Sequence, residues 1–174
     1  MENPRLKLII ALIVAAGLIR VLPHPPNFAP IAAMALFAGA YVANVRLALL
    51  VPLVAMLLSD MVLGFHAGMV LVYVCMGITV IIGTQLRKRL RVVPIATAAL
   101  ASSVLFFVVT NFGVWATQGM YPISFEGLVA CYVAAIPFFH NSLLGNAFFT
   151  AVLFGGFALI TRHSPRLRGS TGIA

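Results

Sequence analysis

The sequence predicts an all-α integral membrane protein with six transmembrane helices and both termini in the cytoplasm, folded as a single membrane domain over residues 1–174. Of these residues 63% are hydrophobic and only 8% are charged, with a mean hydropathy of +1.12. No soluble domain of this size needs such a high fraction of apolar residues. Ten of the eleven Lys and Arg residues, all but Arg20, lie where a six-span topology places the cytoplasm. Such a bias orients membrane proteins with their basic loops inside.

The six spans are expected at about 6–22, 29–43, 45–64, 67–86, 94–116 and 141–160. The first span ends at a Pro-rich segment, because proline cannot continue a helix. It resembles a signal peptide loosely, but no small-residue cleavage site follows it, so we expect a retained helix. The second is short for a core of ~30 Å at ~1.5 Å per residue. Pro52 predicts a kink in the third, and Pro94 suits the first turn of the fifth.

The last apolar stretch, 126–160, is too long for one crossing and contains Pro137. The basic run at 87–91 places the end of the fourth span inside, so the fifth span ends outside. The basic tail after residue 160 belongs inside, which leaves room for one crossing. We therefore expect a short outer-face half-helix at 125–138, followed by the last span. A broken helix at membrane depth is tolerated only beside protein or a water-filled cavity.

The formal net charge of +8 would favour nucleic acid as the partner of a soluble protein. Here the basic residues form short clusters beside the spans. Orientation and anionic lipid explain them better, so we expect the lipid bilayer and no nucleic acid as a partner. The two cysteines, Cys75 and Cys131, lack the spacing of a structural zinc site.

Asp60 is the most informative single residue, because it lies about one turn inside the outer end of the third span. A carboxylate at such a depth costs about 2.5 to 3.5 kcal/mol on insertion scales, so it faces a cavity or a partner. Two interpretations are open. Asp60 contacts a ligand at the floor of a site, or it forms a structural ion pair with Arg20, which also lies near an outer end.

The outer loops supply further candidates. His24 and Asn27 lie in the first outer loop, where three prolines stiffen the chain and lower the entropic cost of holding a side chain. We expect this loop to form a lid or a wall of a site. The alternative is that the loop only ends the helix and that His24 is exposed. His66 lies in a Gly-rich turn, where it either binds a ligand or caps the turn. Tyr121 belongs to the same outer polar set.

The fifth span carries Asn111 and Trp115 one helical turn apart, and Phe107 extends the same face. An amide beside aromatic rings suits a planar ligand. Interfacial Trp residues give the same pattern without any function. On the fourth span, Cys75 lies about 12 Å from the outer end at ~1.5 Å per residue. A buried Cys is most often a small apolar residue, and the alternative is a thiolate ligand for a soft metal centre.

An intramembrane hydrolase is a weaker alternative. Ser59, Asp60, His24 and His66 include the residue types of a catalytic triad. A catalytic Ser needs a base within about 3 Å and an oxyanion hole. The nucleophile-elbow pattern Gly-x-Ser-x-Gly does not occur in the chain. We therefore predict no enzymatic activity and no catalytic residue.

Several sequence blocks carry a family resemblance. They read Leu-Pro-His-Pro-Pro-Asn-Phe-Ala-Pro at 22–30, Ala-Leu-Phe-Ala-Gly-Ala-Tyr at 35–41, Leu-Ser-Asp at 58–60, Thr-Asn-Phe-Gly-Val-Trp at 110–115 and Ala-Ile-Pro-Phe-Phe at 135–139. Over nearly its whole length the chain resembles the substrate-binding (S) components of energy-coupling-factor vitamin transporters. The resemblance implies six helices, cytoplasmic termini, a vitamin pocket at the outer face and a place in the bacterial inner membrane.

The resemblance also implies roles for particular residues. Ala11 and Ala15 match the Ala-x-x-x-Ala pattern with which the first helix of S components docks on the coupling protein. Within the group the chain most resembles solitary cobalamin transporters, whose membrane-embedded Cys is an axial ligand of cobalt. Cys75 would take that role, with His24 and Asp60 near the corrin ring. Thiolate binding would then displace a weaker axial ligand, an incidental chemical step.

We therefore expect a transporter that captures a vitamin at the outer face, with cobalamin as the transported ligand and no intrinsic cofactor. Its partners would be a coupling protein with ATPases, or none if the protein works alone. Two other interpretations stay open. The same fold would serve a different vitamin with Cys75 structural, or the chain would be a membrane scaffold without transport.

Overall fold

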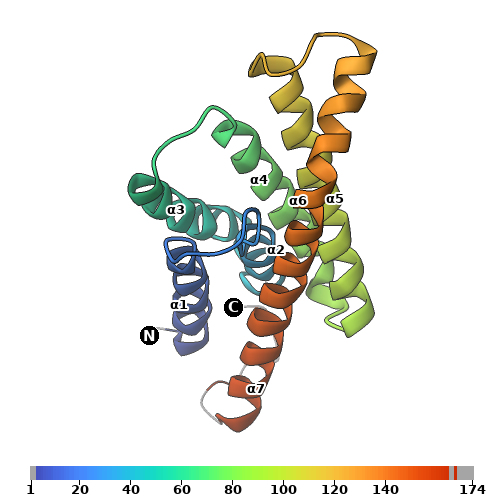
Figure 1. The fold of residues 1–174 in the computed structure, drawn as a ribbon. Coiled ribbons are helices and arrows are strands. Elements are labelled where there is room, and N and C mark those ends of the chain that lie inside the picture. Colours follow the sequence, from blue (N-terminus) through green and yellow to red (C-terminus); the bar gives the residue numbers. More distant parts are fainter. Residues whose placement is uncertain (1–2, 165–166, 168–174) are drawn as a thin grey trace.

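A computed structural model describes residues 3–164 and 167, and every regular element in this part of the chain is helical (Figure 1). The helices are α1 (Pro4–Ile19), α2 (Ile31–Tyr41), α3 (Val45–Leu63), α4 (Met69–Gln85), η1 (Leu86–Lys88), α5 (Val92–Thr117), α6 (Phe125–Thr150), η2 (Ala151–Gly155) and α7 (Gly156–His163). The 3₁₀ turn η1 continues α4, and the π-helical turn η2 joins α6 to α7.

Within the described residues, four helical segments are long and apolar enough to cross a membrane, which makes the chain a multi-pass membrane protein. They are Val45–Leu63, Met69–Lys88, Val92–Thr117 and Phe125–His163. The bounds of the predicted third, fourth and fifth spans lie within two residues of these. α1, at 16 residues, and α2, at 11, are shorter than a ~20-residue crossing. The total of six spans therefore stays a prediction.

The predicted break near Pro137 is wrong. Helix α6 passes through Pro137 without interruption and continues by way of η2 to the end of α7. A proline removes one N–H bond inside a helix, and here α5 supports α6 on both sides of it. The Tyr132 hydroxyl donates to the Val108 carbonyl at 2.7 Å, and the Asn146 amide donates to the Ala99 carbonyl at 2.8 Å. At ~1.5 Å per residue this helix exceeds a ~30 Å core and projects beyond it.

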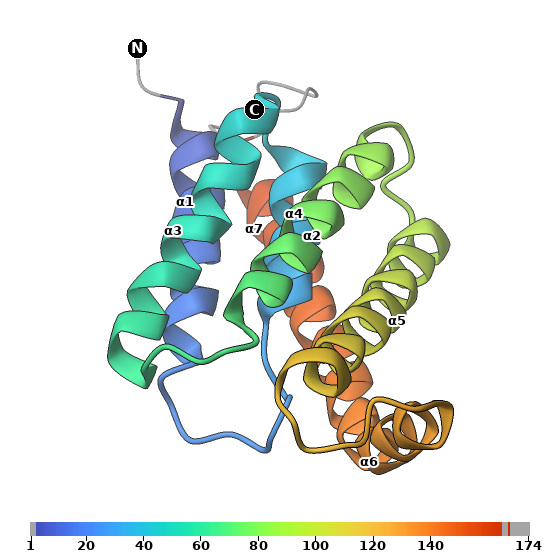
Figure 2. The ribbon, with the colours of Figure 1, turned by 90° about the horizontal axis from the view of Figure 1, so that it is seen from above.

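Helix α2 is the centre of the molecule. Viewed from above, it lies between α1 and α3 on one side and α5 and α6 on the other (Figure 2), and every residue from Ala32 to Tyr41 is buried. Its small residues allow this position. A Cβ atom added to Gly39 would overlap the Val80 carbonyl of α4, and one added to Gly83 would meet the Leu36 carbonyl of α2. Glycines at the crossing therefore bring the two backbones into contact.

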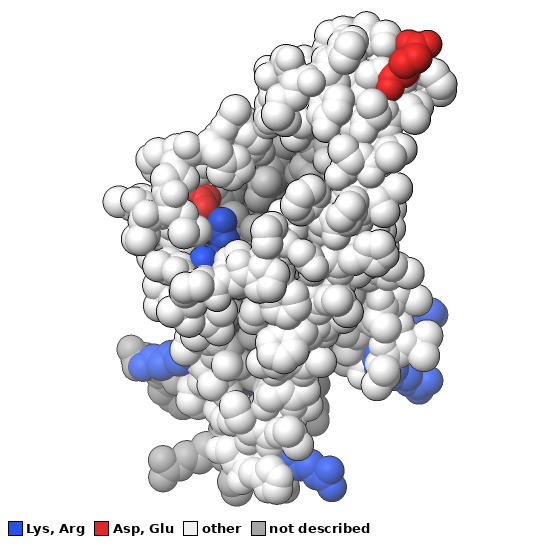
Figure 3. All heavy atoms as spheres, in the orientation of Figure 1, with Lys and Arg blue, Asp and Glu red and all other residues white. Residues whose placement is uncertain are grey.

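Basic side chains gather at one end of the molecule. In Figure 3 the visible Lys and Arg side chains lie at the lower end, apart from one that adjoins an acidic side chain higher up. We call the lower end the basic end and the opposite end the far end. Helix α1 begins and α7 ends at the basic end (Figure 1). Arg87 has a structural role there, because its guanidinium donates to the carbonyls of Gly39 at 2.9 Å and Val42 at 2.7 Å, close to the C-terminus of α2.

Candidate solute cavity at the far end

A cavity of about 340 Å³ opens at the far end. Figure 3 shows the recess between the arm of α5 and α6 and the part formed by α3 and α4. The lining residues come from the loop before α2 and from α2, α4, α5 and α6, and they include Asn27, Ala32, His66, Val72, Ser103, Phe106, Phe107, Thr110, Asn111, Gln118, Phe138, Phe139, Ser142 and Asn146. None of the described lining residues is an Asp, Glu, Lys or Arg. The lining therefore offers amide, hydroxyl, aromatic and one imidazole group, and it is neutral while His66 is unprotonated.

One face of α5 supplies the longest wall. Phe107 and Asn111 of the predicted stripe line the cavity, whereas Trp115 does not, and the Asn111 amide donates to the Phe107 carbonyl at 2.7 Å. An Asn side chain has two N–H donors and one oxygen acceptor, so this bond leaves capacity for a ligand. The Phe107 ring packs on Phe139 of α6 with the ring centroids 4.5 Å apart. These contacts fix the aromatic part of the wall.

The Pro-rich loop before α2 forms part of the rim. Asn27 lines the cavity and has a φ of 62°, in the left-handed region that Asn tolerates better than most residues. The Asn141 amide of α6 donates to the Pro26 carbonyl at 3.0 Å. Gly145 allows α6 to approach the loop, because a Cβ added there would lie 3.0 Å from the Cα of Phe28. The loop therefore lies at the rim of the cavity and is hydrogen-bonded to α6, and its role as a wall of a binding site stays a prediction.

The floor of the cavity contains two residues that the sequence analysis missed. Asn146 and Ser103 are buried and line the cavity. The Asn146 amide donates to the Ser103 hydroxyl at 2.9 Å, and its oxygen accepts from the Thr150 hydroxyl at 3.3 Å. The signal for Asn146 was an amide inside an apolar helix, a placement that calls for a partner on a neighbouring helix.

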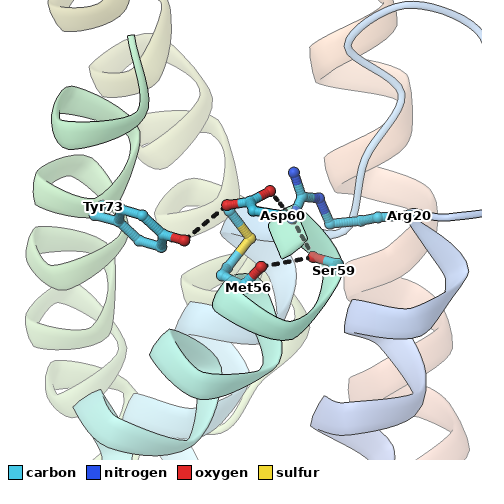
Figure 4. Close-up of polar contacts among 5 residues, drawn as sticks. All are labelled: Arg20, Met56, Ser59, Asp60 and Tyr73. Carbon is cyan, nitrogen blue, oxygen red and sulfur yellow. Dashed lines mark hydrogen bonds and ion pairs between the residues drawn. The ribbon is translucent and has the colours of Figure 1, made fainter. Parts of the chain in front are cut away.

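The buried charged residues Arg20 and Asp60 form a separate network with Ser59 and Tyr73 between α1, α3 and α4 (Figure 4). The Arg20 guanidinium lies 2.9 Å from an Asp60 carboxylate oxygen and donates to the Ser59 hydroxyl. The Tyr73 hydroxyl donates to the second Asp60 oxygen at 2.7 Å, and Ser59 donates to the Met56 carbonyl at 2.8 Å. Arg20 is 9% exposed and Asp60 is 1% exposed. Of the two interpretations of Asp60, the ion pair with Arg20 is the one that the structure contains, and Asp60 does not line the cavity.

Four other predicted site residues lie away from the cavity lining. The Trp115 ring nitrogen donates to the Pro122 carbonyl at 2.9 Å, so this side chain is turned towards the loop between α5 and α6. Tyr121 is half-buried in that loop, and His24 is exposed with Nδ1 2.9 Å from the Pro25 carbonyl oxygen. Cys75 is fully buried, three residues beyond the lining residue Val72 on α4. His66, Asn27 and Asn111 remain as predicted lining residues.

The predicted docking residues of the first helix are accessible. Ala11 and Ala15 lie four residues apart on α1, and both are exposed. The opposite face of α1 carries the buried residues Ile9, Ile13 and Gly17, and a Cβ atom added to Gly17 would lie 2.9 Å from the Cβ of Ala55 on α3. Helix α1 therefore packs on α3 through one face and presents the small-residue face outward.

The fold and the cavity define a class of protein, a multi-pass helical membrane protein with a neutral, solute-sized cavity at the end opposite its basic residues. Residues 1–167 match a family described as a family of unknown function (DUF6580), and the chain belongs to this family. No curated protein and no solved structure matches the chain.

Proposed function

We propose that this protein captures a small, uncharged or weakly polar ring compound of the vitamin class at the outer face of the bacterial inner membrane and delivers it for uptake. The observation that carries the proposal is the cavity lining. Amides, hydroxyls, one imidazole and four phenylalanine rings surround about 340 Å³, while the buried charges pair with each other elsewhere. Ligand pockets of about 300–1,000 Å³ with apolar walls and a few polar groups are typical small-molecule sites.

The chemistry of the walls favours a planar ligand. Phe106 and Phe107 on α5 and Phe138 and Phe139 on α6 offer ring faces and edges, which pack well against another ring. Asn111 and Gln118 offer both donors and acceptors around them. A ligand with a fixed charge would enter without an opposite charge in the lining, which is costly in a site of low dielectric constant.

The distribution of basic residues and the exposed face of α1 support the transport part of the proposal. Basic residues collect on the cytoplasmic side of membrane proteins, so the far end would face outward, in a six-span topology with cytoplasmic termini. The exposed face of α1 with Ala11 and Ala15 would dock on a coupling protein, since small residues let helices approach closely. Concentrative uptake would require partner ATPases. Without them the protein would equilibrate or trap its ligand.

A thermal-shift screen of the detergent-purified protein against individual vitamins tests the proposal. We expect one ring-containing vitamin to raise the melting temperature, because a ligand that binds only the folded state stabilises it. Val72→Trp places a large ring in the cavity and should abolish the shift. Val74→Trp is the matched control on α4, since Val74 is 49% exposed and does not line the cavity.

A vitamin shift that survives in Val72→Trp and not in Val74→Trp would reject the cavity as the binding site. No shift of the wild-type protein with any vitamin would favour the scaffold interpretation instead.

Capture of a corrinoid is a second candidate, favoured by the position of the buried Cys75 about one helical turn from the lining residue Val72 on α4. A thiolate is a soft donor suited to a metal centre. A corrinoid is larger than the present cavity, so α4 would have to shift to expose the thiol. After incubation with cobalamin and desalting, a retained and shifted visible spectrum that is lost in Cys75→Ala would support this candidate. No retained colour in either protein would eliminate it and leave the small-ring proposal intact.

A further inference from the structure

A second hollow lies between α5 and the helix formed by α6 and η2, in the half of the molecule nearer the basic end. It is a groove of about 620 Å³. Its lining comprises Val92, Ile95, Ala96, Ala99, Leu100, Ser103, Leu143, Leu144, Asn146, Ala147, Thr150, Ala151, Phe154 and Gly155. Several of these side chains are exposed, among them Leu100 at 55% and Leu144 at 63%. The groove is therefore open along the lipid-facing side of the helices.

The polar atoms of the groove already have partners. Ser103 and Asn146 are shared with the floor of the far-end cavity and close the groove at that side. Asn146 donates to Ala99 and Ser103, and its oxygen accepts from Thr150. The Ser103 hydroxyl also donates to the Ala99 carbonyl at 3.1 Å. The remaining lining is aliphatic or aromatic. A hydrocarbon occupant suits such a surface, because the two amide hydrogens of Asn146 and the hydroxyl hydrogens of Ser103 and Thr150 are already donated to other protein atoms.

The length of the groove matches one leaflet. Val92 and Ser103 mark its two ends on α5, and at ~1.5 Å per residue they are about 16 Å apart along the helix. Half of a ~30 Å hydrocarbon core is about 15 Å. One acyl chain of the adjacent leaflet would therefore extend from the membrane surface to the Ser103–Asn146 layer.

The open end of the groove is positively charged. Arg91 directly precedes the lining residue Val92, Arg89 lies two residues earlier, and both arginines are exposed. Arg87 of the same run is turned inward to the carbonyls of Gly39 and Val42, so it is engaged in the fold. Two arginines beside an apolar groove complement the phosphate of a lipid whose acyl chain lies in the groove.

We propose that this groove is a binding site for one anionic phospholipid of the leaflet on the basic side, with an acyl chain between α5 and α6 and the phosphate held by Arg89 and Arg91. The site depends on the membrane location of the protein and does not depend on solute capture in the far-end cavity.

Native mass spectrometry of the full-length protein in detergent, with phosphatidylglycerol or phosphatidylcholine added, tests the proposal. We expect one phosphatidylglycerol to be retained in preference to phosphatidylcholine. Ala96→Trp fills the groove and should remove the bound lipid. Ala101→Trp is the matched control, because Ala101 is exposed on α5 and does not line the groove. Arg89→Gln and Arg91→Gln should each weaken phosphatidylglycerol binding roughly fivefold, whereas Arg46→Gln at the same end should leave it unchanged.

Gly155→Leu provides a second groove variant in case Ala96→Trp does not fold, because a Cβ atom added to Gly155 meets no atom within 4 Å. Equal lipid retention in a folded groove variant and in Ala101→Trp would overturn the proposal. Equal loss of the phosphatidylglycerol preference in Arg46→Gln and Arg91→Gln would also overturn it, because the phosphate would then have no particular site.

Discussion

Two sets of polar residues lie near the far end of this protein, and they differ in the partners of their hydrogen bonds. The charged network of Arg20, Ser59, Asp60 and Tyr73 connects α1, α3 and α4, and its members bond to one another. The cavity between α4, α5 and α6 is lined by amides, hydroxyls and rings, and we propose that it binds the solute. The two groups adjoin on α4, where Tyr73 belongs to the network and Val72 to the cavity.

The comparison indicates that a residue that is costly to bury in a membrane can be committed to the fold and lie outside the proposed binding site. A buried carboxylate needs an opposite charge and hydrogen bonds, and here Arg20 and Tyr73 supply them. That requirement leaves Asp60 committed to the fold. Neutral amides cost less to bury, so the protein can keep them beside a hollow. We therefore assign stability to the charged network and solute binding to the neutral cavity.

Loss of the Asp60 carboxylate should give the largest effect. Asp60→Ala leaves the buried Arg20 guanidinium without its opposite charge, and we expect a destabilisation of about 3–5 kcal/mol. Melting in detergent measures it. The double variant Arg20→Met with Asp60→Leu should recover much of the loss, because a buried ion pair can be replaced by apolar residues of similar size. A single variant that melts like the wild type would break the assignment of this network to stability.

Substitution in the cavity should act on binding and leave stability nearly unchanged. Asn111→Leu removes an amide from the wall, and we expect solute affinity to fall about tenfold, as for one lost hydrogen bond of about 1.4 kcal/mol. The melting temperature without ligand should change little, since the Phe107 carbonyl also lies in the helix ladder of α5. Titration with the vitamin found in the screen measures the affinity. Unchanged affinity would remove Asn111 from the site.

Tyr73→Phe tests whether the charged network and the cavity act independently at the point on α4 where they adjoin. The variant loses the hydrogen bond to Asp60 and keeps the ring, so we expect a destabilisation of about 1 kcal/mol. Solute affinity should remain within about twofold of the wild type, because Tyr73 does not line the cavity. A loss of affinity larger than the loss of stability would show that the two groups are coupled through α4.

Trp115→Phe should have the smallest effect. The variant loses the bond from the ring nitrogen to the Pro122 carbonyl, and we expect at most about 1 kcal/mol in stability and no change in solute affinity. Melting and titration on the same preparation check both. A strong loss of affinity would restore Trp115 to the site in which the sequence analysis placed it.

The sequence predicted the helical class and most helix positions, because hydropathy and basic clusters are local signals. It also predicted Asn27, His66 and Asn111 as site residues, and all three line the cavity. It failed at Pro137, because contacts from α5 maintain the helix on both sides of the proline. It could not separate the two roles of Asp60, since the choice depends on whether Arg20 reaches it through space. Asn146 was missed because its partners, Ala99 and Ser103, are more than forty residues away in the chain.

The most direct test of assigning stability to the charged network and solute binding to the cavity is an equilibrium binding measurement. It compares two variants side by side, with the vitamin found in the thermal-shift screen as the ligand. One is the charge-free double variant, Arg20→Met with Asp60→Leu, and the other is the cavity-filling variant Val72→Trp. We expect the charge-free protein to bind within about twofold of the wild type, and the cavity-filled protein to show no binding while remaining folded. Binding that is lost in the folded charge-free protein and kept in Val72→Trp would contradict the account and place the solute at the charged network.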